Sequence, residues 1–313
     1  MVGGGHEARG YPSPGAGYRR PVKRVVLIAN PRSGRGRALR LRDATRDRLA
    51  GAGHEPRVVA LEEANAELMR EADAAVVFGG DGTLHGLLPA LRESKVAVYH
   101  APLGTENLFA REFGGKPDPI AIARAVGADR VRAVDLGLLN GTGKARPFAI
   151  MVSLGPDAGV IHRLHASRRG AITHAAYVLP TLAEVLRPSL PPVTIHVDGR
   201  EVVSATPGIT VVANLRQYGL RIDPAAEADG SDGLLDVVFM PCATGLGALA
   251  RTLAARLRRH ASSVVRGRGS SVRVRSERPG YAQADGEVLA IGHDGFDLRL
   301  GVDPAALRVI LPG

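Results

Sequence analysis

The chain has 313 residues, which is enough for two modest domains or one large one with a sizeable buried core. Hydrophobic residues make up 45% and charged residues 23%, a balance that excludes a wholly disordered chain. The formal net charge of +10 favours an anionic partner such as nucleotide phosphates, an anionic membrane surface or nucleic acid, although biased codon usage explains the arginines equally well. Aromatic residues are only 4% of the chain and tryptophan is absent, so base-stacking platforms are scarce and we expect no nucleic-acid partner.

The cysteine content and the apolar runs bear on the compartment. Cys242 is the only cysteine, which excludes an internal disulfide and fits a reducing environment. Residues 1–21 are rich in glycine and proline, lack the apolar core of a signal peptide, and are expected to form a disordered tail. The sequence contains no run of about 18 apolar residues, so we expect a cytoplasmic protein that meets any membrane from outside.

The first part of the chain alternates short apolar runs with helical stretches. This alternation predicts a parallel sheet with helices on both faces, whose ligand lies at the carboxyl ends of the strands. Glycine-containing breaks follow three of the strands, so all three are expected at that edge. The predicted strands cover 23–29, 57–61, 74–78 and 96–100, and the helices cover 37–50, 63–71 and a stretch ending at 92.

After about Val131 strands follow one another, which predicts an antiparallel sandwich or barrel-like domain. Two helices are expected to interrupt it. In the second, leucines share one face and arginines the other, and we expect the leucine face to pack into the core; a basic amphipathic helix resting on a membrane is the alternative. The predicted strands cover 133–139, 147–154, 193–197, 209–213, 235–240, 272–275 and 296–300, and the helices cover 173–186 and 246–265.

The strongest single motif is Phe78-Gly79-Gly80-Asp81-Gly82-Thr83-Leu84, directly after a buried strand. Its glycines allow a phosphate to approach the backbone closely, and the helix that follows adds positive partial charge. A carboxylate beside a phosphate is repulsive unless it holds Mg²⁺ or takes a proton from an attacking hydroxyl. The alternative is an ordinary glycine-rich turn that Asp81 caps. This alternative explains the glycines but not the motifs that accompany them.

Three weaker motifs accompany it. Residues 30–34 read Asn-Pro-Arg-Ser-Gly and residues 102–107 read Pro-Leu-Gly-Thr-Glu-Asn, each after a strand, and both offer polar groups that can bind a nucleotide. Residues 284–287 read Ala-Asp-Gly-Glu and put two acidic groups on a tight turn. Taken singly, each is also an ordinary loop or hairpin.

In this order, the four motifs resemble the diacylglycerol kinase catalytic superfamily, which includes sphingosine kinases and bacterial lipid kinases. The resemblance covers nearly all of the chain after residue 22. Smaller landmarks agree with it, namely Asp135-Leu136-Gly137, Ser153-Leu154-Gly155 with Asp157-Ala158, and Asp232-Gly233-Leu234-Leu235-Asp236.

The resemblance implies an N-terminal α/β domain with a parallel sheet, as in NAD kinases and diacylglycerol kinases, and a β-rich sandwich C-terminal domain. It implies domains at 22–132 plus 303–313 and at 133–302, with a last strand at 307–311 returning to the first. ATP lies between them, with Asp81 and Glu287 as the catalytic carboxylates; we favour Glu287 as general base and leave that choice open. The residues implied to bind the nucleotide are Asn30, Pro31, Ser33, Gly34, Gly79, Gly80, Asp81, Gly82, Thr83, Gly104, Thr105 and Asn107.

Some bacterial members carry a structural Mg²⁺, which Asp229, Asp232 and the backbone of Leu234 would match here. The partners implied are ATP, Mg²⁺ and a lipid alcohol at a membrane surface, with peripheral contact at the inner membrane face and a homodimer left open. The resemblance does not identify the acceptor lipid.

The sequence departs from the family pattern at His85, Gly86 and Leu108, where the family usually has Asn, Glu and Asp. Subfamily variation without consequence, a different acceptor and weakened activity all stay open. For His85 we consider contact with phosphate or substrate and a cap on its own helix. The competing functions are an NAD kinase and a degenerate member that binds nucleotide or lipid without turnover.

Overall fold

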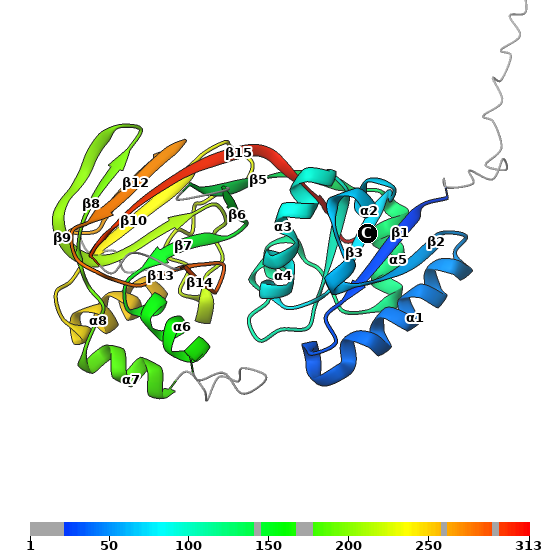
Figure 1. Cartoon of the computed structure of the whole chain (residues 1–313), viewed down its shortest axis with the longest axis horizontal. Coiled ribbons are helices and arrows are strands. Elements are labelled where there is room, and N and C mark those ends of the chain that lie inside the picture. The colour runs from blue at the N-terminus through cyan, green and yellow to red at the C-terminus, as the bar shows by residue number, and fades with distance from the viewer. Residues whose placement is uncertain (1–21, 141–144, 167–177, 258–261, 290–293) are drawn as a thin grey trace, which may run out of the picture.

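The computed structural model describes residues 22–140, 145–166, 178–257, 262–289 and 294–313. The tail expected at residues 1–21 and the start of the helix expected at 173–186 lie outside these residues. Figure 1 shows an α/β part and a β-rich part side by side, joined by two long strands. Within the described residues, no helix combines the length and apolarity needed to cross a membrane.

The N-terminal α/β domain contains the predicted parallel sheet, in the order β2-β1-β3-β4. Its central strands are buried on both faces, and alternate residues enter different cores. Val26 and Ile28 of β1 pack into one hydrophobic cluster while Val25 and Leu27 pack into the other, as a sheet covered on both sides requires. The strands are β1 (Arg24–Ala29), β2 (Glu55–Ala60), β3 (Ala74–Gly79) and β4 (Ala97–Pro102).

Helices cover both faces of this sheet (Figure 1). Asn65 and Asp118 cap two of them by accepting hydrogen bonds from the backbone N–H groups of Leu68 and Ala121. The helical elements are η1 (Ser33–Gly36), α1 (Arg37–Gly51), η2 (Leu61–Glu63), α2 (Ala66–Arg70), α3 (Asp81–Ser94), α4 (Leu108–Phe113) and α5 (Pro119–Ala128).

The C-terminal region is β-rich, and its strand pairs are antiparallel. One structural difference from the sequence prediction concerns 147–154, which forms two strands with a break at Ala149 and Ile150. The strands are β5 (Val131–Asn140), β6 (Arg146–Phe148), β7 (Met151–Leu154), β8 (Pro192–Val197), β9 (Arg200–Ala213), β10 (Leu235–Pro241), β11 (Val265–Gly269), β12 (Ser271–Ser276), β13 (Ala282–Ala284), β14 (Glu287–Leu289) and β15 (Phe296–Ile310).

β15 joins the two parts. The sequence predicted separate strands at 296–300 and 307–311, but the structure has one strand that is irregular between Asp303 and Leu307. Its first half pairs with β12, its end pairs in parallel with β4, and β5 runs antiparallel along both halves. The β15 and β5 pair therefore forms the bridge seen in Figure 1.

Three helices pack on the C-terminal region: α6 (Pro156–Ala166), α7 (Val178–Leu186) and α8 (Gly245–Arg256), with a 3-10 turn, η4, at Gly219–Arg221. Two expectations for the helix at 246–265 were wrong. The helix ends at Arg256, and Val265 begins β11. The buried side of α8 carries small residues, Ala248 and Ala255 among them, so the leucine side faces outward.

Candidate active site

The glycine-rich turn between β3 and α3 brings the predicted loops together. β3 is fully buried, Gly80 is the N-cap of α3, and Asp81 is the first residue of that helix. The Leu103 N–H donates to the Gly79 carbonyl at 2.8 Å, which places the loop after β4 against this turn. The motifs at 30–34, 79–83 and 102–107 thus meet at the carboxyl edge of the sheet, as the alternation predicted.

Two of the glycines touch backbone to backbone. A Cβ added to Gly80 would lie 3.0 Å from the Gly104 Cα, and a Cβ added to Gly104 would lie 2.8 Å from the Gly80 Cα. A side chain at either position would push the two loops apart. This contact leaves backbone groups exposed without Cβ atoms, which is the arrangement that suits a phosphate.

Asn30 connects the first loop to the same turn. Its Nδ2 donates to the Thr83 Oγ1 at 2.9 Å, and its Oδ1 accepts from the Arg32 N–H at 3.0 Å. The loop continues through Ser33, which is half-buried, and Gly34, which has φ of +60°. Pro31, by contrast, is exposed.

The loop after β4 is closed by Asn107. This residue has φ of +52°, and its side chain both accepts from the Gly104 N–H at 2.7 Å and donates to the Gly104 carbonyl at 2.8 Å. Asn107 therefore shapes the loop containing Thr105 from within. The helix α4 begins at the next residue, Leu108.

Asp81 holds the start of α4. Its carboxylate accepts from the backbone N–H groups of Leu108 at 2.9 Å and Phe109 at 3.1 Å. Burial raises the pKa of Asp81 despite these hydrogen bonds and the nearby His100. Both carboxylate oxygens are thus engaged by the protein, which indicates a positioning role.

His100 is a buried neighbour that the sequence analysis missed. Its Nε2 lies 3.0 Å from the Gly79 carbonyl, and its Nδ1 is buried without a hydrogen-bond partner among the described residues. Burial lowers the pKa of His100, so the imidazole is neutral and its Nε2–H donates to Gly79. It supports the carbonyl side of the glycine-rich turn.

Glu287, the first residue of β14, lies against the turn from the other domain. A Cβ added to Gly82 would lie 2.6 Å from the Glu287 Oε1. The Glu287 carboxylate therefore lies in the space beside Gly82 that a side chain there would enter. The structure brings the two predicted catalytic motifs together across 205 residues of sequence, since they carry the numbers 82 and 287.

Asp285 is a further functional candidate, although the sequence analysis gave it no role of its own. It is 6% exposed and accepts from three backbone N–H groups, those of Ala149 at 2.7 Å and Ile150 at 2.8 Å in the break between β6 and β7 and that of Met151 at 3.0 Å at the start of β7. Its φ of +50° makes the turn that presents Glu287. The signal that could have identified it is the pair of acids in the motif at 284–287.

His85 makes a polar contact between the domains. Its Nδ1 lies 3.0 Å from the Asp285 Oδ2, so it caps neither its own helix nor an adjacent turn. Burial lowers the pKa of His85, but the hydrogen bond that His85 donates to Asp285 and the charges of Asp285 and Glu287 outweigh it, and the pKa is raised overall. His85, which departs from the family pattern, is thus paired with Asp285.

A polar network lies beneath the hairpin of β13 and β14. Gln283 accepts from the Gly286 N–H at 2.7 Å and donates to the Ser153 Oγ at 2.6 Å, and Ser153 in turn hydrogen-bonds Asp157. The Tyr218 hydroxyl donates to Asp157 at 2.5 Å, and burial followed by the charge of Asp157 raises the pKa of Tyr218. This network holds the turn that carries Glu287.

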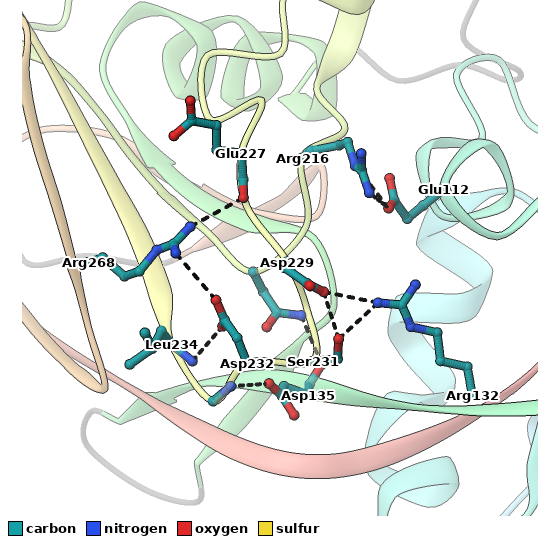
Figure 2. Close-up of polar contacts among 12 residues, drawn as sticks. Glu112, Arg132, Asp135, Arg216, Glu227, Asp229, Ser231, Asp232, Leu234 and Arg268 are labelled. Atoms are coloured by element: carbon teal, nitrogen blue, oxygen red, sulfur yellow. Dashed lines mark hydrogen bonds and ion pairs between the residues drawn. The ribbon is translucent and has the colours of Figure 1, made fainter.

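The predicted metal ligands lie elsewhere, at the turn before β10 (Figure 2). Asp229 pairs with the Arg132 guanidinium at 3.0 Å and accepts from the Ser231 hydroxyl at 2.7 Å. Asp232 accepts from the Leu234 N–H at 3.0 Å, and Figure 2 shows its carboxylate beside a second arginine, Arg268. Arginines thus compensate both carboxylates, and within the described residues no three Asp, Glu, His or Cys side chains form a group suited to a metal ion.

This turn and α4 also fasten the two domains. The buried Asp135 carboxylate accepts from the Gly233 N–H and from the Ala305 N–H in the irregular part of β15, both at 2.7 Å. On the other side, Glu112 of α4 pairs with Arg216 of the C-terminal region at 3.0 Å (Figure 2). The element that Asp81 positions is therefore anchored to the second domain.

Comparisons with known proteins identify the family of the chain. Residues 24–139 match the model of the diacylglycerol kinase catalytic domain, and residues 150–311 match that of the YegS C-terminal NAD kinase beta sandwich-like domain. The chain is 29% identical over 232 residues to a protein named "Diacylglycerol kinase" from Mycobacterium tuberculosis, covering 71% of this chain and 74% of that relative. It is 31% identical over 248 residues to a protein named "Probable lipid kinase YegS-like" from Pseudomonas aeruginosa, covering 76% of each.

A solved structure from Bacillus anthracis has the same fold, with a TM-score of 0.76 at 20% identity over 96% of this chain and 98% of that one. A diacylglycerol kinase structure from the same organism gives a TM-score of 0.66 at 18% identity over 92% and 96% of the two chains. The fold, the two matched family models and the more similar relatives lead to one assignment. The chain belongs to the diacylglycerol kinase catalytic-domain superfamily of lipid kinases.

Proposed function

We propose that the protein is an ATP-dependent lipid kinase that moves the γ-phosphate of ATP to the hydroxyl of a lipid such as diacylglycerol. The observation that supports this most directly is the approach of Glu287 to Gly82, which sets a carboxylate against a phosphate-binding type of turn. A capped turn at the start of a helix requires only a local capping residue, so it does not account for a second carboxylate that comes from the other domain.

The predicted nucleotide residues fit this role. The contact between Gly80 and Gly104 would be lost with any side chain, and Asn30 and Asn107 hold the loops on either side. We propose these loops as the site of the ATP phosphates, with Thr83 and Thr105 beside them. Mg²⁺, when bound with ATP, neutralises phosphate charge.

The chemistry proposed for the chain is a proton transfer that accompanies phosphoryl transfer. The lipid hydroxyl oxygen forms a bond to the γ-phosphorus, the bond from that phosphorus to the β-phosphate oxygen breaks, and ADP leaves. The hydroxyl proton passes to the Glu287 carboxylate, which acts as general base. Asp81 positions α4 and the loop before it.

The arrangement of Asp81 supports this division of roles. Its two oxygens accept hydrogen bonds from the backbone N–H groups of Leu108 and Phe109. A carboxylate engaged in this way orients a helix well but has little capacity left for a substrate proton. Glu287 is the carboxylate that faces the turn, so we propose it as the base.

Diacylglycerol is the first acceptor to test because a relative carries that name. We propose a cytoplasmic enzyme with peripheral contact at the inner membrane face, and a homodimer is left open. The predicted Mg²⁺ site at Asp229, Asp232 and Leu234 stays a prediction, and the paired arginines would compete with a cation there.

The test is turnover of the purified full chain with Mg²⁺ and labelled ATP over a panel of lipid alcohols in mixed micelles, following label into the organic phase. We expect label in a lipid. Label transferred to NAD instead would favour the NAD kinase alternative. Nucleotide binding without transfer to any acceptor would identify a member that has lost turnover.

A further inference from the structure

The helix α7 exposes three leucines on one side. Leu179, Leu182 and Leu186 recur at the spacing of one helical face and are 76%, 52% and 73% exposed. The opposite side of α7 packs inward through Glu184, which is 1% exposed and pairs with Arg163 of α6 at 3.0 Å. The apolar face is therefore the outer one.

The helix α8 has the same arrangement. Leu246, Leu249, Leu253 and Leu257 are 71%, 49%, 57% and 56% exposed, while the small residues of the helix are buried. At Gly245 the helix begins so close to α7 that an added Cβ would collide with the Val185 carbonyl. Figure 1 shows α7 and α8 together at one edge of the C-terminal region. We call these seven leucines the leucine surface.

The exposure of so many leucines on one surface indicates that this surface binds a partner. Single exposed leucines are ordinary on a protein surface, but seven on two touching helices mark a binding face. The charges around it favour an anionic partner. Arg256 ends α8 and Arg187 follows α7, both exposed, whereas Glu184, which is buried, is the only acidic residue in the two helices.

The leucine surface is also connected to the active site. α7 packs on α6, and α6 packs on the hairpin of β13 and β14 that carries Glu287. The His162 ring of α6 stacks on Tyr281, just before β13, at a centroid distance of 4.4 Å. A surface held by α7 and α8 therefore lies one helix away from the proposed catalytic carboxylate.

We propose that the leucine surface docks the protein on an anionic lipid bilayer, with the leucines entering the interface and Arg187 and Arg256 facing lipid head groups. This inference rests on the proposed lipid kinase function and adds the surface by which the enzyme reaches its substrate. An apolar face flanked by arginines, on two helices whose described residues include no exposed carboxylate, suits this partner better than a second copy, which would bring the same positive charges together.

The test uses the full chain and sedimentation with vesicles of phosphatidylcholine, with and without phosphatidylglycerol. The variant is Leu182→Ser, Leu249→Ser and Leu253→Ser combined. The matched control is Ile120→Ser, which changes a 47% exposed side chain on α5 of the other domain. We expect the triple variant to lose about tenfold or more in partitioning to the anionic vesicles, and the control to bind like the natural chain.

Kinase assays separate this inference from the proposed function. The triple variant should phosphorylate a short-chain acceptor in solution at the natural rate and a long-chain acceptor in anionic vesicles more slowly. Loss of vesicle binding in a chain that phosphorylates no lipid would support the surface and contradict the proposed function. Unchanged binding, equal binding to neutral vesicles, or a natural dimer that the triple variant converts to monomers without loss of binding would each overturn the surface.

Discussion

The His85 imidazole lies 3.0 Å from the Asp285 carboxylate, and this contact joins the helix after the glycine-rich turn to the hairpin that carries Glu287. The two residues come from different domains. Asp285 also accepts from three backbone N–H groups, which hold its carboxylate in place independently of His85. The contact therefore fixes the position of α3 relative to the hairpin of β13 and β14.

The first prediction concerns pH. The pKa of His85 is raised above its ordinary value of 6.5, so the folded state binds this proton more tightly than the unfolded state does. The stabilisation that the protonated His85 contributes is fully present below pH 6.5, and it is lost as the pH rises through the pKa of His85 in the folded state. Arg146 opposes the shift, and Asp285 and Glu287 favour it. Unfolding free energies of the natural chain and of His85→Asn should differ more at roughly pH 6 than at roughly pH 9.

The control for this experiment is His196→Asn on β8, whose side chain is 34% exposed and 3.8 Å from Glu201. Because this substitution leaves the His85–Asp285 contact intact, it controls for the loss of an imidazole elsewhere in the fold. A His85→Asn difference that stays constant across the pH range would mean that the His85 contact contributes through packing alone.

The second prediction concerns Glu287. Replacing it with Gln keeps the shape next to Gly82 and removes the basic oxygen, so turnover should fall by about 10²-fold or more while the fold is retained. Glu277→Gln, at a side chain that is 86% exposed, is the matched control and should leave turnover unchanged. Circular dichroism checks the fold. Near-natural turnover in Glu287→Gln would exclude this residue as the general base.

The third prediction separates positioning from chemistry at Asp81. Asn offers one acceptor where the carboxylate offers two, so one of the N–H groups of Leu108 and Phe109 loses its partner, at a cost of about 1–3 kcal/mol. We expect turnover to fall together with faster hydrogen exchange of those two amides. Asp118→Asn, at the cap of α5, is the control and should leave turnover unchanged, because Asn caps a helix about as well as Asp. Lost turnover without faster exchange would place Asp81 in the proton transfer itself.

The fourth prediction concerns the turn before β10. The Arg132 guanidinium competes with any cation for Asp229, which it contacts at 3.0 Å. Without nucleotide, Mg²⁺ should therefore raise the midpoint of thermal unfolding less in the natural chain than in Arg132→Gln. Chelation with EDTA should return each protein to its metal-free midpoint. An equal Mg²⁺ effect in both proteins would show that Arg132 does not occupy the site.

The sequence predicted the N-terminal domain well because two physical regularities act there. Apolar runs that are buried on both faces identify parallel strands, and the carboxyl ends of parallel strands share one edge. The meeting of Gly80 with Gly104, and of Asn30 with Thr83, follows from that edge. The approach of Glu287 to the same edge was expected only from the family resemblance, since nothing local links positions so far apart.

Other features could not be predicted from periodicity. The pattern of α8 shows which residues share a face, but it does not show which face turns inward. Gly245 and Ala248 allow close helix contact, and that contact outweighed the burial of leucines. The hydrogen-bond partners of Asp285 could not be predicted either, because they are backbone N–H groups at 149–151 and every residue except proline has such a group. His100 likewise stands in an apolar strand, and only its contact with Gly79 shows its place.

The pairing of β15 with β4 has a consequence for synthesis on the ribosome. The β4 strand is completed early in translation, but Ala97 and Val98 find their partners, Arg308 and Val309, only when nearly the whole chain has emerged. Until then the sheet of the N-terminal domain has an open edge, the kind of edge that pairs with other chains. Folding of the first domain therefore finishes last, and shortening the chain by its final strand would leave that edge exposed to aggregation.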